Sequence, residues 1–228
     1  MRPKITYYGH SCFAVELGGK NILFDPFITP NPKATTVDIS TIKPDVILVT
    51  HGHGDHIADL VPIAKESLAQ VISVYEITEW LNNQGIKNTL PMNIGGSINL
   101  GFATIKMVKA EHSSSFPDGS YAGNAAGFVL QAGDTCFYYA GDTALTLDMQ
   151  LIPLTHKLDF AFLPIGDNFT MNVSDAIKAA KFTDCNKIIG MHFDTFPPIE
   201  IDHKSAYDAF SAAGMNLVLP IINQKFEL

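Results

Sequence analysis

The sequence predicts an α+β domain in which two mixed β-sheets pack face to face and helices cover their outer faces. In each half of the chain, strand-like segments come first and helical patterns are interleaved later. Hydrophobic residues make up 46% of the 228 positions and charged residues 17%, a globular composition that can bury a large core. No linker, low-complexity stretch or shift in composition divides the sequence, so we expect one domain over residues 1–228.

The first half begins with short apolar runs of strand length. Gly18-Gly19 predicts a hairpin turn between two of them. The continuous apolar run over 45–50 is typical of a strand that is buried on both faces. Pro62 predicts a distortion in the helical pattern that follows, and Gly85 predicts the end of a short helix. The expected strands are 5–8, 12–17, 21–24, 45–50 and 71–74, and the expected helices are 57–70 and 77–83.

The second half repeats this scheme, which is why two similar layers are expected. Ser174 is placed to cap the N-terminus of one helix, and Gly214 is placed to end another. The expected strands are 103–110, 127–131, 136–140, 160–164 and 187–191, and the expected helices are 174–182 and 204–213.

The charge of the chain argues against nucleic acid as a partner. Fifteen Lys and Arg residues face 23 Asp and Glu residues, for a net charge of −8. A duplex-binding surface needs a basic stripe, and this sequence has none. Arg2 is the only arginine, so a bidentate arginine clamp on phosphate is nearly excluded as well. We therefore expect a small-molecule substrate, and a homo-oligomer stays open.

The remaining compositional signals favour a cytoplasmic protein. The N-terminus leads directly into a predicted strand, with no signal peptide, and no apolar run approaches the ~18 residues of a membrane span. Cys12, Cys136 and Cys185 lack zinc-finger or CxxC spacing, and two of them lie in apolar strands. We expect buried free thiols, which suit a reducing compartment.

A dense cluster of metal-competent side chains follows the buried strand at 45–50. The run from Thr50 to His56 reads THGHGDH, and its alternating glycines let the backbone fold tightly so that the side chains can converge. Imidazole and carboxylate ligands together suit Zn, Mn, Fe or Ni rather than Ca or Mg. Taken alone, Asp55 could instead cap the next helix.

Three further ligand-type residues occupy equivalent places, just past the ends of other predicted strands. They are His112, Asp142 and His192. Singly, Asp142 would be an ordinary turn residue and each histidine a polar loop group. Loops at strand ends can position catalytic and metal-binding side chains on a rigid sheet, so the repeated placement favours one common site.

The count of candidate ligands favours two metal ions. One metal needs three or four protein ligands, and seven are too many for a single ion. A carboxylate can offer one oxygen to each of two metals, and Asp142 is the favoured bridge. The seven candidates are His51, His53, Asp55, His56, His112, Asp142 and His192.

The run from His51 to His56 is similar to the HxHxDH signature of the metallo-β-lactamase superfamily in every defined position. The later ligands follow in that superfamily's order. Four shorter segments resemble, more narrowly, the metal-dependent hydrolases related to ascorbate-6-phosphate lactonase. These segments are GHSCF at 9–13, AGDT at 140–143, GDNFTM at 166–171 and MHFDTFPP at 191–198.

The resemblance implies a four-layer αβ/βα sandwich, the metallo-β-lactamase fold, with the site at one edge. The sequence departs from the family pattern at two positions. The best-known β-lactamase subclass has cysteine where Asp142 falls, which argues against β-lactamase activity. Asn172 stands where glycine is expected. The resemblance implies that His51, His53 and His112 hold the first metal, that Asp55, His56 and His192 hold the second, and that Asp142 bridges them.

Several other residues are expected beside the metals. His10 lies between two predicted strands, either as a hydrogen-bonded turn residue or as a catalytic group that faces substrate and donates to an oxyanion. Asp25 could orient a metal-bound histidine through its other ring nitrogen or simply form a turn. Asp194 is a similar candidate. The residues expected to line the substrate pocket with His10 are Asp167, Thr170 and Met171.

The favoured reaction is hydrolysis by a hydroxide that bridges two divalent metals, with Asp55 as a ligand that also orients this nucleophile. Zinc is expected first, with Mn, Ni or Fe also possible. A small ester or lactone substrate ranks above a phosphodiester, because arginine is nearly absent and the net charge is −8. An iron-dependent redox enzyme of the same fold and a non-catalytic metal-binding protein also stay open.

Overall fold

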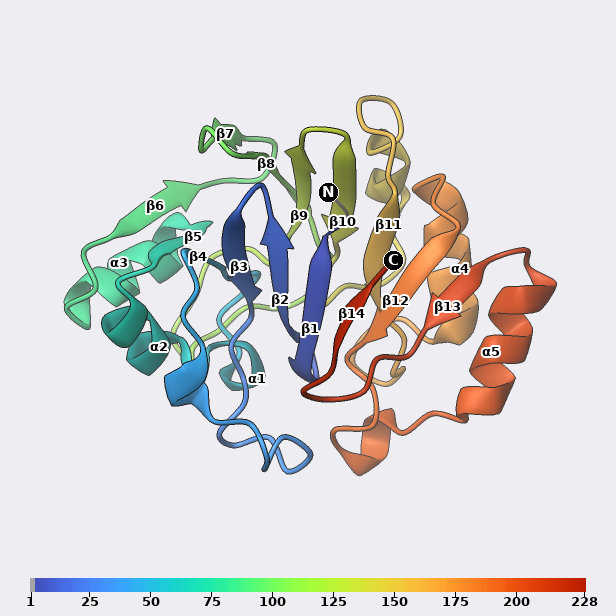
Figure 1. The fold of residues 1–228 in the computed structure, drawn as a ribbon, viewed down its shortest axis with the longest axis horizontal. Coiled ribbons are helices and arrows are strands. Elements are labelled where there is room, and N and C mark those ends of the chain that lie inside the picture. The colour runs from blue at the N-terminus through green and yellow to red at the C-terminus, as the bar shows by residue number, and fades with distance from the viewer. Residues whose placement is uncertain (1–2) are drawn as a thin grey trace.

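The computed structural model describes residues 3–228, so Arg2 lies outside the described residues. It contains two seven-stranded sheets that pack face to face, as expected from the sequence (Figure 1). The two sheets have the same plan. Each begins with antiparallel strands and continues with parallel ones, because each half of the chain runs from hairpins to helical crossovers.

The first sheet has the order β14-β1-β2-β3-β4-β5-β6. Its pairs are antiparallel from β14 to β3 and parallel from β3 to β6. The strands are β1 (Lys4–Gly9), β2 (Cys12–Leu17), β3 (Lys20–Phe24), β4 (Val46–Leu48), β5 (Gln70–Val74), β6 (Thr89–Met92) and β14 (Lys225–Glu227).

The second sheet has the order β13-β12-β11-β10-β9-β8-β7. Its pairs are antiparallel from β7 to β10 and parallel from β10 to β13. The strands are β7 (Ser97–Asn99), β8 (Thr104–Lys109), β9 (Ala126–Ala132), β10 (Thr135–Tyr139), β11 (Phe160–Pro164), β12 (Lys187–Met191) and β13 (Asn216–Val218).

The helices flank the sheets, with α1 to α3 beside the first and α4 and α5 beside the second (Figure 1). This is the four-layer arrangement implied by the resemblance. The α-helices are α1 (Gly54–Ile57), α2 (Leu60–Ser67), α3 (Tyr75–Asn83), α4 (Val173–Phe182) and α5 (His203–Ala212), and the 3-10 helices are η1 (Ile39–Thr41), η2 (Leu147–Leu151) and η3 (Pro197–Ile199).

Aromatic side chains fill the space between the sheets. Phe24 of β3 stacks on Tyr139 of β10 with ring centroids 4.3 Å apart, and Phe13 of β2 meets Phe162 of β11 edge to face at 4.8 Å. All four are fully buried. Large rings in such geometries contribute both buried area and specific contacts, so they hold the two sheets in one fixed relation. That relation matters because the candidate ligands come from both sheets.

Two expectations about helices were wrong. The helix expected at 57–70 is two helices, because α1 ends at Ile57 and α2 begins at Leu60. Asp59 lies in the gap, where its carboxylate accepts the backbone N–H groups of Ile28 and Thr29 at 2.6 and 2.8 Å. Pro62 lies in the first turn of α2, where a missing N–H is tolerated.

The expected N-cap at Ser174 was also wrong. Asn172 caps α4 instead, and its side-chain oxygen accepts the backbone N–H of Asp175 at 2.9 Å. The helix therefore begins at Val173, one residue before the expected start. Asn172, which stands where the resemblance implies glycine, thus has a structural task.

The strand expected at 45–50 spans only Val46–Leu48, and the helix expected at 77–83 begins earlier, at Tyr75. The glycines expected to end two helices and the expected free thiols are confirmed. Gly85 and Gly214 follow α3 and α5 with positive φ, and all three cysteines are buried and free. Within residues 3–228, no helix has the length and apolar character needed to cross a bilayer.

Candidate metal centre

The candidate ligands converge because four strands end at the same edge of the sandwich. His51 follows β4, His112 follows β8, Asp142 follows β10 and His192 follows β12. The short helix α1, at the lower centre of Figure 1, carries Asp55 and so brings a carboxylate to the same edge. The expectation of one common site beyond the strand ends is confirmed.

Two glycines permit the close approach of the ligand loops. Gly141 has φ +63°, and a Cβ there would lie 2.8 Å from the Thr50 side chain. A Cβ on Gly52 would lie 2.3 Å from the Cβ of Ala122. Only glycine fits such positions, so Gly141 lets the loop that carries Asp142 approach Thr50, next to His51, and Gly52 lets the His51 loop approach Ala122.

Eight side chains form three overlapping groups in which all the potential ligand atoms lie within 4.8 Å of one another. All seven candidate metal ligands belong to these groups, together with His10. The groups are His51, His53 and His112; His51, His56 and Asp142; and His10, Asp55, His56 and His192.

The carboxylate of Asp142 is at the middle of the cluster. Its Oδ2 lies 2.9 Å from Nε2 of His192, 3.3 Å from Nε2 of His56 and 3.6 Å from Nε2 of His112. The His56 nitrogen is buried and has no hydrogen-bond partner within residues 3–228, and the same is true of Oδ1 of Asp142. Buried polar atoms left in this way are expected where a metal ion binds. The donor set therefore fits divalent metal ions.

Asp25 fixes the orientation of two of these histidines. Its Oδ2 accepts a hydrogen bond from Nδ1 of His56 at 3.0 Å and another from the Thr50 hydroxyl at 2.8 Å. Because that hydroxyl donates its only proton to a carboxylate, its oxygen accepts from Nδ1 of His51 at 3.0 Å. Both rings thus present an Nε2 lone pair to the cluster, which is how protein ligands are usually prepared for metal.

Burial and the close packing of these side chains shift their pKa values. Burial, aided by neighbouring His56, lowers the pKa of His51 well below its usual value. Burial also opposes charge on His56, but the carboxylates of Asp142 and Asp25 outweigh it and raise that pKa. Burial would raise the pKa of Asp142, but His192 and His56 lower it well below its usual value. The neutral ring of His51 and the ionised Asp142 carboxylate are in the state that takes up a metal cation, whereas His56 must release its proton when a metal binds.

His10 lies at the inner side of the cluster. Its Nε2 is 3.2 Å from Oδ2 of Asp55 and its Nδ1 is 2.9 Å from the Thr195 hydroxyl. Burial, together with nearby His192, lowers the pKa of His10 to about 4. Burial would raise the pKa of the Asp55 carboxyl, but the neighbouring rings of His10 and His56 lower it below its usual value.

The expected substrate residues lie on the loop between β11 and α4. The backbone N–H of Met171 donates to the carbonyl of Thr143, next to Asp142, at 3.2 Å. Asp167 is exposed and lines a groove of about 650 Å³ between α4 and α5. Met171 is buried, and its burial weighs against direct contact with substrate. The substrate contacts of Asp167, Thr170 and Met171 stay predictions.

Two further expectations from the sequence have clear outcomes. Asp25 orients a candidate ligand as expected. Asp194 does not, because its carboxylate binds Nε2 of His203 at 2.6 Å and the backbone N–H of Ile201 at 3.0 Å. It therefore braces the start of α5.

Sequence reasoning missed Thr50 and Thr195 as partners of His51 and His10. Thr50 had a local signal, since a hydroxyl at the end of a buried strand precedes the first candidate ligand. Thr195 had none, because it meets His10 across 185 residues of sequence.

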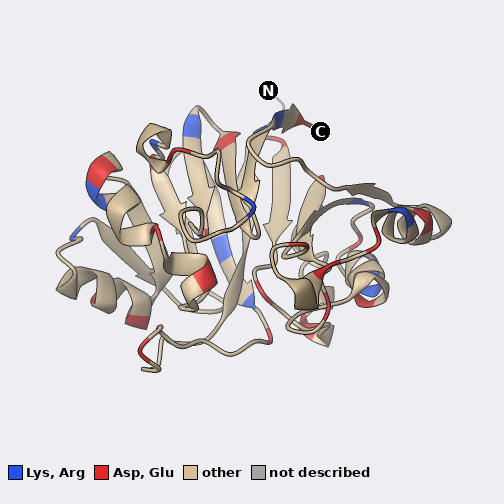
Figure 2. Ribbon diagram, turned by 90° about the horizontal axis from the view of Figure 1, so that it is seen from below, with Lys and Arg blue, Asp and Glu red and all other residues tan. Residues whose placement is uncertain are grey.

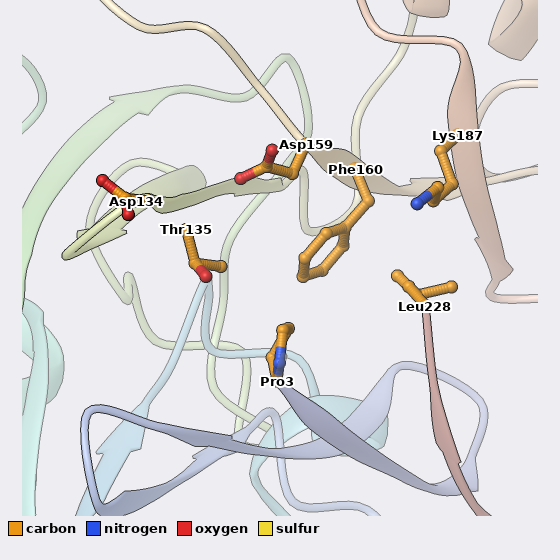
Figure 3. A pocket seen from close by; sticks show the side chains of 7 residues that line it. All are labelled: Pro3, Asp134, Thr135, Asp159, Phe160, Lys187 and Leu228. Carbon is orange, nitrogen blue, oxygen red and sulfur yellow. The ribbon is translucent and has the colours of Figure 1, made fainter. Parts of the chain in front are cut away.

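A hollow of about 530 Å³ lies elsewhere, at the N-terminal ends of β10, β11 and β12 (Figure 3). Asp134, Asp159 and Lys187 are the charged residues that line it, and Leu228 lines it as well. None of the eight clustered side chains lines it. We therefore place the candidate site at the histidine cluster, which contains the candidate metal ligands, rather than in this hollow.

In the view of Figure 2, lysines and acidic residues are scattered over several elements, and no element in this view carries a continuous basic stripe. This agrees with the net charge of −8.

The comparisons with known proteins identify the family. Residues 4–192 match the family model described as a beta-lactamase superfamily domain. The chain is 53% identical over 225 residues to a UPF0173 metal-dependent hydrolase of Flavobacterium johnsoniae, covering 99% of this chain and 100% of the relative. It is 51% identical over 207 residues to one of Methylacidiphilum infernorum, covering 91% and 92%.

Solved structures give the same result. Igni18, described as a novel metallo hydrolase of Ignicoccus hospitalis, superposes with a TM-score of 0.90 at 33% identity and full coverage of both chains. The metallo-beta-lactamase fold protein YhfI of Bacillus subtilis superposes with a TM-score of 0.77 at 16% identity, also over both full chains, which shows the fold alone. The chain belongs to the UPF0173 family of metal-dependent hydrolases, within the beta-lactamase superfamily.

Proposed function

We propose that the chain hydrolyses a small ester or lactone-type substrate at a centre of two divalent metal ions, of which zinc is the first expectation. One observation carries this proposal. The Oδ2 atom of Asp142 lies within 3.6 Å of ring nitrogens from His56, His112 and His192. These histidines arrive from three separate segments, and a shared carboxylate among them suits a bridge between two ions.

The remaining ligands divide to either side of this bridge. Nε2 of His51 and Nδ1 of His53 lie 3.0 Å apart, so that both nitrogens face one point. We assign His51, His53 and His112 to the first ion and Asp55, His56 and His192 to the second, with Asp142 between them.

When bound, divalent ions of this kind lower the pKa of a coordinated water and so supply hydroxide at neutral pH. The residues of the chain orient the ligands and leave one side of the cluster accessible. Thr50 and Asp25 hold two imidazoles in the required tautomer. Asp55 has a side chain that is 32% exposed, which puts it at the opening, where it can orient the attacking nucleophile. The side chain of His112, another member of the cluster, is 15% exposed. Substrate would enter on this side.

The charge pattern supports a carboxylic ester or lactone over a phosphodiester. A phosphate-bearing substrate is usually held by arginine, and the only arginine here is Arg2. Lys109, at the end of β8 and shortly before His112, is already paired with Glu111 at 3.0 Å and with Asp148 at 3.3 Å. An uncharged acyl substrate needs no such clamp.

The test begins with elemental analysis of protein purified without chelator or a metal-binding tag. We expect close to two equivalents of metal per chain, followed by turnover of a member of a panel that contains lactones, esters, thioesters and phosphodiesters. Turnover of phosphodiesters alone would replace the ester assignment. Iron with redox activity would replace hydrolysis by redox chemistry. Less than one equivalent after reconstitution would overturn the two-metal centre.

A further inference from the structure

We infer that Nε2 of His10 is an additional ligand of the second metal ion, beside Asp55, His56 and His192. This inference rests on the proposed two-metal centre. It also changes the role expected from the sequence, in which His10 faces substrate. The position of the ring, the direction of its lone pair and the rigidity of its backbone all support a ligand role.

The position of His10 is that of a ligand. Its Nε2 lies 3.2 Å from Oδ2 of Asp55, and its ring centroid lies 4.1 Å from that of His192. The ligand atoms of His10, Asp55, His56 and His192 all lie within 4.8 Å of one another. A single ion can therefore meet all four side chains with small adjustments, since metal–ligand distances are about 2.0–2.2 Å.

The hydrogen bonds of His10 direct the lone pair of Nε2 toward the cluster. The Thr195 hydroxyl lies 2.9 Å from Nδ1 of His10 and 3.4 Å from the carbonyl oxygen of Phe193. In the tautomer that can bind a cation, the hydroxyl donates its single proton to this carbonyl and accepts the Nδ1 proton of His10. In the neutral ring, Nε2 then carries the lone pair, and it faces a carboxylate oxygen that also has no proton. A cation between the two satisfies both.

The same hydroxyl arrangement prepares a ligand elsewhere in the centre. The Thr50 hydroxyl donates to Asp25 and accepts from Nδ1 of His51, which is one of the seven expected ligands. The Thr195 hydroxyl therefore supports the ring of His10 in the same way as the Thr50 hydroxyl supports the ring of His51. A hydrogen bond to the remote ring nitrogen is the usual support of a metal-bound histidine.

The backbone ties His10 to His192. The carbonyl of His10 accepts the backbone N–H of His192 at 2.9 Å and the Tyr7 hydroxyl at 3.2 Å. Both histidines have positive φ values, +58° and +55°, which non-glycine residues rarely adopt. Strain of this kind persists where the surroundings enforce it, and such positions gather at functional sites.

The surroundings of His10 leave little room for a substrate contact. Its side chain is fully buried, and the rings of Phe27 and Phe196 meet it edge to face with centroids 5.5 and 5.7 Å away. Substrate could reach this ring only through the cluster itself.

A ligand role for His10 makes the two metal positions unequal. The first ion has three histidines and Asp142, while the second has Asp55, His56, His192, His10 and Asp142. Zinc prefers about four ligands, so the second position suits an ion that accepts more, such as manganese or iron.

The test is a titration of metal-free full-length protein with Co²⁺, which reports both affinity and coordination through its visible absorption. Wild-type protein should bind two equivalents, with weaker absorption for the ion of higher coordination number. His10→Ala should bind the second equivalent at least about tenfold more weakly and give that ion a stronger absorption band. Thr195→Val should weaken the same equivalent by a smaller factor. His203→Ala removes a histidine outside the cluster and should match wild type.

The outcomes separate this inference from the proposed function. Wild-type protein with fewer than two Co²⁺ sites would overturn the two-metal centre itself. Two wild-type sites together with unchanged affinity and spectrum in folded His10→Ala would overturn the ligand role alone. If activity fell in that variant while both metal readouts stayed the same, His10 would be the substrate-facing residue expected from the sequence. Should His10→Ala fail to fold, His10→Gln and Thr195→Val carry the same test.

Discussion

The two sides of the metal centre differ in how they meet solvent. On the outer side, His53 and His112 are partly exposed. On the inner side, His10, His56 and His192 are buried, and hydrogen bonds or backbone ties hold each of them. The difference teaches that one edge of the cluster is built for access and the other for fixed geometry. Variants on both sides can challenge or refine this division.

The largest effect is expected at Asp142, which belongs to both sides. Asp142→Ala removes the carboxylate that three imidazoles share, so metal loading near two equivalents and hydrolytic activity should be lost together. Elemental analysis and the substrate panel check this. A folded variant that retains both ions would contradict the bridging assignment.

Removal of Asp25, on the inner side of the cluster, should destabilise the folded protein. Its carboxylate and His56 form a pair with no exposed side-chain surface, so Asp25→Ala leaves a buried histidine without its partner. We expect a loss of about 3–5 kcal/mol in the free energy of unfolding, measured by urea denaturation.

Asp45→Ala is the matched control for that variant. Asp45 also binds a backbone N–H and a cation, from Asn21 and Lys20, but its side chain is 40% exposed. Its loss should cost about 1 kcal/mol or less. Equal effects of the two substitutions would contradict the contrast between buried and exposed pairs.

The pH dependence of metal-free protein tests the buried rings. His10 has a pKa of about 4 when folded and about 6.5 when unfolded. Between these values the unfolded chain binds a proton that the folded chain does not, so stability should fall as the pH drops from 6.5 toward 4. The lowered pKa of His51 acts in the same direction.

His56 affects the alkaline side of the dependence of stability on pH. Its pKa is raised in the folded state, so its contribution is fully present below about pH 6.5 and is lost as the pH rises through the folded value. Urea denaturation from pH 4 to 9 should show a maximum near the middle of this range. His10→Gln should flatten the acid limb, and an unchanged limb would contradict the burial argument.

A smaller effect is expected from Thr50→Val. The change removes the hydroxyl that orients His51 but leaves all seven expected ligands in place, so metal affinity should fall by about 10- to 100-fold. Thr155→Val is the matched control, because the Thr155 hydroxyl lies 2.8 Å from Nδ1 of His156, outside the cluster. Competition with a chelator measures both. Equal losses in the two variants would indicate a general effect of the lost hydroxyl.

The smallest effect is expected at His203. Its pair with Asp194 is partly exposed, with 51% and 33% of the two side chains accessible. His203→Ala should change the free energy of unfolding by about 1 kcal/mol or less and leave metal content unchanged. Loss of metal in this variant would extend the centre beyond the eight clustered side chains.

Local patterns were enough to predict most of the fold and the convergence of the ligands. The run from His51 to His56 is contiguous, and the later ligands follow buried strands whose apolar character is plain in the sequence. Short strands such as β6 and β7 escaped prediction because they are only four and three residues long and most of their residues are not buried. Pairing with a neighbour, rather than local propensity, makes them strands.

The missed contacts share one physical cause. Thr195 supports His10 only because β1 and the loop after β12 meet, and Asn172 displaces Ser174 as a cap because the loop enters α4 one residue earlier. Such contacts depend on how the chain is placed in three dimensions. No short window of sequence contains them.

The pairing of β14 with β1 has a consequence for the order of events during synthesis. Residues 225–227 complete the first sheet beside residues 4–6, although the strands before them in the sequence belong to the second sheet. His10 likewise bonds to a backbone group made 182 residues later. Contacts this distant in sequence form late. The nascent chain therefore cannot complete this cluster until nearly the whole protein has been translated, because His192 and its bond to His10 come late in the sequence.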